Sequence, residues 1–130
     1  MRRRTDDATR WLLDGDPAIR WQTLRDLAGA AESSVGRERR KVARAGWGAR
    51  LLAEQDAAGT WGNGLYSPKW ISTTYTMLLL RDFGLPAGNR QTRKACTLLL
   101  DGGLLRDGGI NYGWRGPSET CITLEGSRTY

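Results

Sequence analysis

Several residue types are scarce or missing in this chain. Its 130 residues include no histidine, one phenylalanine, two methionines and two cysteines. Without histidine, the chain lacks the commonest zinc ligand and the commonest general base of enzymes. The two cysteines, Cys96 and Cys121, fit a reducing compartment better than a disulfide framework. We therefore predict no metal site and no cofactor.

Long apolar runs are also missing. No stretch of 18 or more apolar residues occurs, so the sequence predicts no transmembrane helix. The first residues, Met1–Arg4, are basic, but the apolar segment of a signal peptide does not follow them. We therefore expect a cytoplasmic location.

The net charge of +6 is unevenly distributed. Residues 1–50 carry twelve Lys and Arg against seven Asp and Glu, whereas residues 51–130 carry eight against seven. The excess lies in Arg2–Arg4 and in Arg37–Lys41. Such clusters could attract nucleic acid or anionic lipid. In an arginine-rich protein, a charge run is more often a solvated face, so nucleic acid is not the partner that the sequence favours.

What the chain does contain is helical periodicity, six Trp and 17 Gly. Period-two alternation is absent outside the loops, so no strand is predicted. Asp16-Pro17 is typical of a helix start and Gly84-Leu85-Pro86 of a helix end. Between residues 70 and 84 we predict a cap from Ser72, Thr73 or Thr74 and an apolar face made of Tyr75, Leu78, Leu79 and Phe83. The predicted helices span residues 7–14, 17–29, 37–55, 70–84 and 89–100, with one more beginning at 118–123.

The sequence also repeats internally at about 50 residues, a period typical of helical-hairpin arrays. Leu24-Arg25-Asp26 recurs as Leu80-Arg81-Asp82, and Ser72-Thr73-Thr74 is matched by Ser118-Glu119-Thr120, 46 residues later. In each later copy, a Gly-rich loop precedes the second helix. The predicted organisation is a basic disordered tail at 1–6, a helical-hairpin repeat domain at 7–124 and a second tail at 125–130. The repeat units are approximately 7–31, 36–86 and 89–124.

Residues 50–61, Arg-Leu-Leu-Ala-Glu-Gln-Asp-Ala-Ala-Gly-Thr-Trp, resemble the QW motif of squalene and oxidosqualene cyclases. Asp107-Gly108-Gly109 is similar to the repeats of protein prenyltransferase β subunits. The resemblance implies an all-α fold of antiparallel helical hairpins that form an open, partial α/α-toroid, in a truncated member of these families. It also implies that Gln55 caps backbone groups at a helix end and that Trp61 folds back over the helix.

The same resemblance implies a ligand site where the inner helices begin. Aromatic side chains there could line an isoprenoid pocket and stabilise a carbocation, and Lys69 could meet an anionic head group beside a helix N-terminus. The alternative for the aromatic residues is hairpin core, and for Lys69 a solvated position. Asp107, Glu119 and Cys121 could offer acidic or metal-ligand groups, although three such residues without histidine make a weak metal site. The candidate ligand-binding residues are Trp61, Tyr66, Lys69, Trp70, Tyr75, Asp107, Glu119 and Cys121.

No catalytic residue is assigned. The chain lacks the Asp-x-Asp-Asp acid of squalene-hopene cyclases, because Asp14-Gly15-Asp16-Pro17 is a turn without the third Asp. The function implied by the resemblance is therefore binding of, or an ancestral role in cyclising, a hydrophobic isoprenoid-type substrate, and turnover by this chain is not expected. The alternative is a non-catalytic helical-repeat module that binds protein or nucleic acid. Open hairpin faces carrying Tyr75, Leu79 and Phe83 also predict self-association.

Overall fold

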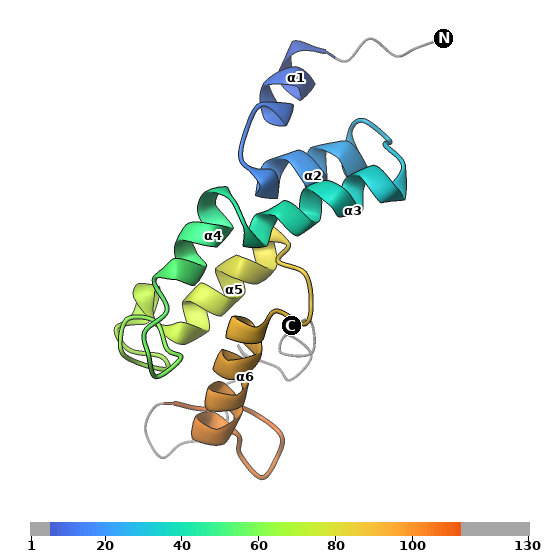
Figure 1. The fold of residues 1–130 in the computed structure, drawn as a ribbon. Helices are drawn as coiled ribbons and strands as arrows, with labels where there is room; N and C mark the ends of the chain where they lie inside the picture. Colours follow the sequence, from blue (N-terminus) through green and yellow to red (C-terminus); the bar gives the residue numbers. More distant parts are fainter. Residues whose placement is uncertain (1–5, 113–130) are drawn as a thin grey trace. The chain divides into compact units, whose positions relative to one another are not determined.

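The computed structural model describes residues 6–112, and all of its regular elements are helical (Figure 1). No strand occurs among these residues, although two isolated bridges join Trp61 to Gly64 and Leu104 to Ile110. The all-α prediction is confirmed for this part of the chain. No helix within it is long and apolar enough to cross a membrane. The helices are α1 (Asp7–Leu13), α2 (Pro17–Asp26), α3 (Glu32–Arg40), α4 (Gly46–Ala53), α5 (Thr73–Phe83) and α6 (Arg90–Gly103), with 3₁₀ turns η1 (Lys41–Ala43) and η2 (Lys69–Ile71).

The chain forms two compact units, which we describe separately. The N-terminal unit consists of residues 6–53 together with 83–86. The C-terminal unit consists of residues 54–82 together with 87–112. The three repeat units expected from the sequence divide the chain at other places and stay a prediction.

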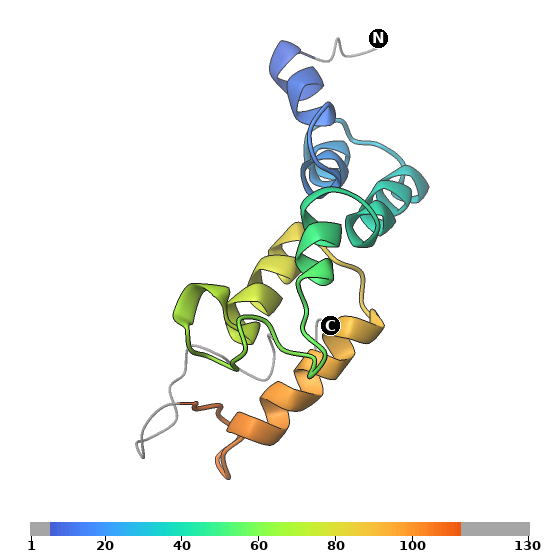
Figure 2. The same cartoon turned by 60° about the vertical axis from the view of Figure 1, so that its left-hand side comes forward.

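In the N-terminal unit, α2 and α3 lie side by side and run in opposite directions (Figures 1 and 2). The buried apolar side chains of this unit include Ala18, Trp21, Val42 and Leu52. Each of them removes apolar area from water, which is the main favourable term in folding. One antiparallel helical hairpin is thus present in this unit.

Asp16 joins the starts of two helices in the N-terminal unit. Its Oδ1 accepts a hydrogen bond from the Ala18 N–H (2.9 Å) and so caps α2, with Pro17 at the first helical position as predicted. Its Oδ2 accepts from the Trp47 N–H (2.8 Å) at the start of α4. Gly46 has a φ of 66°, and a Cβ at this position would collide with the Asp16 carboxylate. A glycine is therefore required where α4 begins.

Residues 83–86 are bonded to α2 and α3. The Trp21 Nε1–H donates to the Phe83 carbonyl (2.8 Å), and the Arg39 Nε–H donates to the Gly84 carbonyl (2.7 Å). The guanidinium of Arg39 also lies 5.1 Å from the centre of the Trp21 ring. Gly84 has a φ of 86° and leaves no room for a Cβ beside that ring, so the predicted helix end at Gly84 is confirmed.

The helix predicted over roughly 37–55, in which the glycines around Trp47 leave room for a kink or a break, is interrupted, because the chain turns between η1 and α4. Gly46 adopts its left-handed conformation there, and the backbone of Gly48 packs so closely on Val42 that no side chain would fit. Moreover, α3 begins at Glu32 within the segment expected to be a connection. Small residues such as Ala and Ser do not prevent a helix when tertiary packing favours one.

In the C-terminal unit, α6 begins where the sequence predicts. The Asn89 side chain caps it by accepting from the Gln91 N–H (3.0 Å) and the Thr92 N–H (3.2 Å). The apolar face predicted for α5, with Tyr75, Leu78, Leu79 and Phe83 inward, is wrong, because nearly the opposite face of the helix is buried. Its buried side chains are Thr73, Thr74, Thr76, Met77 and Leu80, whereas Leu79 is 42% exposed. A pattern that counts apolar residues alone overlooks these inward threonines. Thr73 and Thr74 can be buried because their hydroxyls donate to backbone carbonyls.

Candidate ligand site in the C-terminal unit

Hydroxyl groups at the start of α5 hold the Gly-rich loop that precedes it. Thr73 Oγ1 accepts from the Trp61 N–H (2.9 Å) and donates to the Gly64 carbonyl (2.7 Å). Thr74 Oγ1 donates to the Leu65 carbonyl (2.7 Å). Of the three residues proposed as caps, Thr73 and Thr74 bond the loop instead, whereas Ser72 is the residue directly before α5 and donates its hydroxyl to the Lys69 carbonyl (2.9 Å). Both threonine side chains are buried, so their bonds to the loop are shielded from water.

Gln55, Asp56 and Trp61 complete this loop. Gln55 Nε2 donates to the Gly59 carbonyl (2.9 Å) and to the Gln91 carbonyl (3.0 Å), so Gln55 ties the loop to the first turn of α6 rather than to the end of its own helix. The Thr60 hydroxyl (2.6 Å) and N–H (3.0 Å) donate to Asp56 and hold the pKa of that carboxyl below its usual range. Trp61 is only 2% exposed, which confirms that it is buried.

Four aromatic rings follow one another in this unit, and we call them the aromatic row: Tyr112, Tyr66, Tyr75 and Trp70. The Tyr112 and Tyr66 rings are stacked with centroids 6.4 Å apart, and those of Tyr66 and Tyr75 are 5.7 Å apart. Trp70 meets Tyr75 edge to face at 5.1 Å. The hydroxyls of Tyr66 and Tyr75 lie 3.4 Å apart. The separations fall within the range of favourable aromatic pairs.

Lys69 stands at one end of the aromatic row, with its Nζ 5.0 Å from the centre of the Trp70 ring. Trp70 is 75% exposed, so this end faces solvent. The pair is a cation–π contact of the kind found at protein surfaces, where it contributes about 0.5–1 kcal/mol. An exposed aromatic ring of this size offers a partner a large apolar area.

The other end of the aromatic row borders a hollow of about 410 Å³. Among the six residues that line the hollow, the titratable side chains are those of Tyr66 and Tyr112. The Tyr112 hydroxyl donates to the Leu99 carbonyl (2.6 Å), and burial raises the pKa of Tyr112 above its usual range, with a smaller contribution from Cys96. Burial likewise raises the pKa of the Cys96 thiol, which keeps it protonated and unreactive near neutral pH. The hollow is lined by Leu65, Tyr66, Ser67, Gly102, Asn111 and Tyr112.

The structure brings together half of the predicted ligand-binding residues. Tyr66, Lys69, Trp70 and Tyr75 share the aromatic row or adjoin it. Trp61 is buried in the loop and does not line the hollow. Asp107 organises a turn, in which its Oδ1 accepts from the Gly109 N–H (3.0 Å). Glu119 and Cys121 lie outside the described residues. Among residues 6–112, no group of three or more His, Cys, Asp or Glu could hold a metal ion.

Sequence reasoning missed Tyr112, although the repeat carries the signal that would have found it. Tyr66 and Tyr112 are 46 residues apart, which is the offset between Ser72 and Ser118. Around their glycines the two loops match at an offset of 49 residues instead. The Gly59 N–H donates to the Asp56 carbonyl and the Gly108 N–H donates to the Leu105 carbonyl, and both glycines have a positive φ. The two Gly-rich loops thus share this turn of the backbone, although no single offset relates them throughout.

Comparison of the chain with protein-family models, with curated proteins and with solved structures finds no match.

Proposed function

We propose that this chain is a helical-hairpin repeat protein that binds a hydrophobic, isoprenoid-type ligand on the aromatic row. The observation that carries the proposal is the continuous series of four rings from Tyr112 to Trp70, which borders a hollow at one end and faces solvent at the other. Binding rather than turnover is proposed, because the lining residues supply no acid–base pair and no metal-ligand set.

The relationship to terpenoid cyclases and protein prenyltransferases is part of the same proposal. It is supported by residues 50–61, whose tryptophan is buried and whose glutamine bonds loop backbone, and by the backbone turn that the two Gly-rich loops share. In an open, partial α/α-toroid these loops would lie at corresponding places of successive hairpins. The helical hairpin formed by α2 and α3 is compatible with such an array.

The chemistry of the aromatic row favours an apolar, extended ligand. Ring faces present apolar area together with a negative quadrupole, which suits unsaturated hydrocarbon chains and cationic centres. The volume of the hollow is within the usual range of small-molecule sites, about 300–1,000 Å³, but most of its exposed lining is polar, so the apolar contact area comes from the rings. Lys69 adds one positive charge at the solvent-facing end, where the polar end of an amphipathic ligand would lie.

Isothermal titration calorimetry with farnesol, an isoprenoid alcohol, tests this proposal, with a linear alcohol of similar length as the comparison ligand. We expect farnesol to bind more tightly than the linear alcohol. Trp70→Ala should weaken farnesol binding by about tenfold, the equivalent of about 1.4 kcal/mol for one aromatic contact.

Trp11→Ala is the matched control for this experiment. Trp11 lies in α1 of the N-terminal unit and is 74% exposed, against 75% for Trp70, so both substitutions remove an exposed indole. Farnesol binding should be unchanged in Trp11→Ala. Equal loss in the two variants, or no binding by the parent chain, would refute the proposed site.

A further inference from the structure

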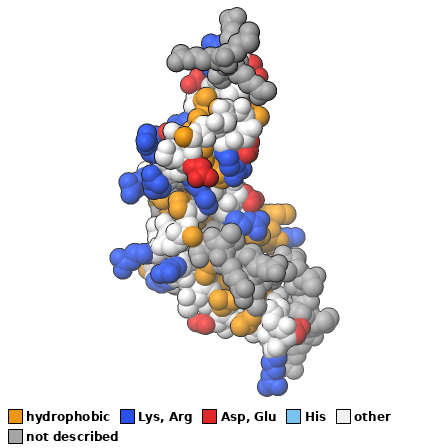
Figure 3. Space-filling model, turned by 90° about the vertical axis from the view of Figure 1, so that its right-hand side faces the viewer, with side chains coloured by type: hydrophobic (Ala, Val, Ile, Leu, Met, Phe, Trp, Pro, Cys, Tyr) orange, Lys and Arg blue, Asp and Glu red, His pale blue; other side chains and the backbone are white. Residues whose placement is uncertain are grey.

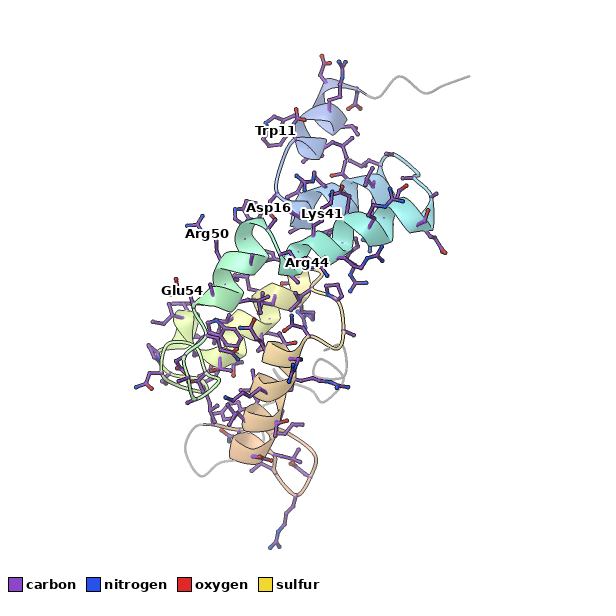
Figure 4. All side chains as sticks on the ribbon, in the orientation of Figure 1. Trp11, Asp16, Lys41, Arg44, Arg50 and Glu54 are labelled. Atoms are coloured by element: carbon purple, nitrogen blue, oxygen red, sulfur yellow. The ribbon has the colours of Figure 1, made fainter. Side chains whose placement is uncertain are left out.

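The N-terminal unit carries four cations at helical spacing, and we call them the basic face: Arg37, Arg40, Lys41 and Arg44. They follow one another at positions i, i+3, i+4 and i+7 through α3, η1 and the residue after η1, which places them on one side of this segment. All four side chains are exposed. Figure 4 shows Lys41 and Arg44 where α3 leads into α4.

Other residues of this segment make contacts within the N-terminal unit. Val42 is fully buried, and Arg39 stacks on Trp21 while it donates to the Gly84 carbonyl. Glu38 accepts from Arg20 Nε (3.0 Å) and also pairs with Lys41. The structural arginines, Arg20 and Arg39, are therefore separate from the three arginines of the basic face, and only Lys41 of this face takes part in such an ion pair among residues 6–112.

The basic face has little counter-charge. Lys41 shares Glu38 with Arg20, and the structure records no salt bridge of Arg37, Arg40 or Arg44 to any carboxylate among residues 6–112. The space-filling view shows Lys and Arg side chains at several places along the surface, with fewer Asp and Glu side chains among them (Figure 3). Uncompensated cations at this density attract polyanions and raise their local concentration.

We propose that the basic face binds the phosphate backbone of nucleic acid without reading its sequence. From Arg37 to Arg44 the segment rises about 10 Å, at about 1.5 Å per residue, and each strand of a duplex carries one phosphate per about 3.4 Å. The segment therefore spans about three phosphate intervals, which corresponds to four consecutive phosphates of one strand. Three of the four cations are arginines, whose planar guanidinium matches phosphate oxygens in pairs.

A membrane surface fits this face less well. Peripheral helices hold to lipid by burying an apolar side as well as by charge. The one large apolar side chain of residues 37–44, Val42, is buried inside the unit. These residues themselves therefore offer a lipid surface charge without a large exposed apolar side chain, whereas a phosphate backbone needs charge alone. The inference is independent of the proposed ligand site, which lies in the other unit.

The experiment is fluorescence anisotropy of the full chain with a labelled duplex DNA of arbitrary sequence, measured at several salt concentrations. Four phosphate contacts predict a slope of log K against log salt of about −3 to −4. The triple variant Arg37→Gln, Arg40→Gln, Arg44→Gln should bind at least about tenfold more weakly, and its slope should fall to about −1. Exchanging the DNA sequence should leave the affinity of the parent chain unchanged.

A triple variant of the C-terminal unit, Arg90→Gln, Arg93→Gln, Arg106→Gln, is the matched control. It removes the same charge from three exposed arginines, so it separates a local site from an effect of net charge. Retained DNA binding in this control supports the proposal. Equal weakening in both triple variants, no DNA binding by the parent chain, or binding only to vesicles that contain phosphatidylserine would each overturn it. Circular dichroism of each variant verifies that the helices are intact.

Discussion

The interactions that stabilise each of the two units from within differ in their chemistry. In the N-terminal unit, charged groups make the ties: Asp16 bonds the starts of two helices, and Arg39 bonds the backbone at Gly84. In the C-terminal unit, the buried hydroxyls of Thr73 and Thr74 hold a Gly-rich loop, and one carboxylate, that of Asp56, adds hydrogen bonds within it. Charged ties are sensitive to pH and salt, whereas buried neutral ties are not. The comparison shows that some arginines of an arginine-rich region can make structural contacts while the others stay exposed and available for binding.

The largest expected effect concerns the loop of the C-terminal unit. Trp61→Ala removes a side chain that is 2% exposed, so it should cost about 3–5 kcal/mol in the free energy of unfolding. Urea unfolding followed by circular dichroism measures this loss. Trp70→Ala, which truncates an indole 75% exposed in the same unit, should cost less than about 1 kcal/mol. Equal stability of the two variants would show that Trp61 is not part of a core.

A smaller effect is expected at the junction of two helices in the N-terminal unit. Asp16→Ala removes the cap of α2 and the bond to the start of α4, which should cost about 1–3 kcal/mol. Thermal unfolding gives the change, and hydrogen exchange should show faster exchange at Ala18 and Trp47. The control is Asp14→Ala, an exposed carboxylate two residues away. A loss of stability in the control equal to that of Asp16→Ala would contradict the assigned role.

The smallest expected effect is a pH-dependent change in the free energy of unfolding, which is expected for ion pairs and not for hydrogen bonds between buried neutral groups. Hydrogen bonds from Lys41 and then Arg20 hold the pKa of Glu38 below its ordinary value of 4.5. Because the folded pKa lies below the unfolded one, the stabilisation is complete above about pH 4.5 and is lost as the pH falls through the folded pKa. Glu38→Gln should therefore cost less than about 1 kcal/mol at pH 7, and this difference from the parent should disappear in acid.

Urea unfolding of both proteins at pH 7 and near pH 3 measures this dependence. The control is Glu54→Gln, at an exposed carboxylate for which the structure records no salt bridge among the described residues. A difference between the parent and Glu38→Gln that stays constant with pH would mean that the side chain contributes by packing and not by its charge.

Much of the helical framework could be read from local residues. Asp16-Pro17, Gly84 and Asn89 mark helix ends in the sequence and in the structure, because caps and left-handed turns depend on a few neighbouring backbone groups. In the candidate site, Tyr66, Lys69, Trp70 and Tyr75 were predicted from their position at the start of a helix. Tyr112 was not, since its stacking on Tyr66 joins residues far apart in the chain.

The sequence by itself determined the helical class of residues 6–112, several helix ends, such as those at Pro17, Phe83 and Arg90, and the surplus of positive charge in the first 50 residues. Only the tertiary structure decided which face of α5 turns inward, because buried threonines satisfy their hydroxyls on a loop that is distant in sequence. It also decided which arginines are structural, since Arg39 finds an aromatic ring and a carbonyl while Arg40 faces solvent. Periodicity reports polarity along one element, but a side chain is buried or exposed according to the partners that the other elements bring to it.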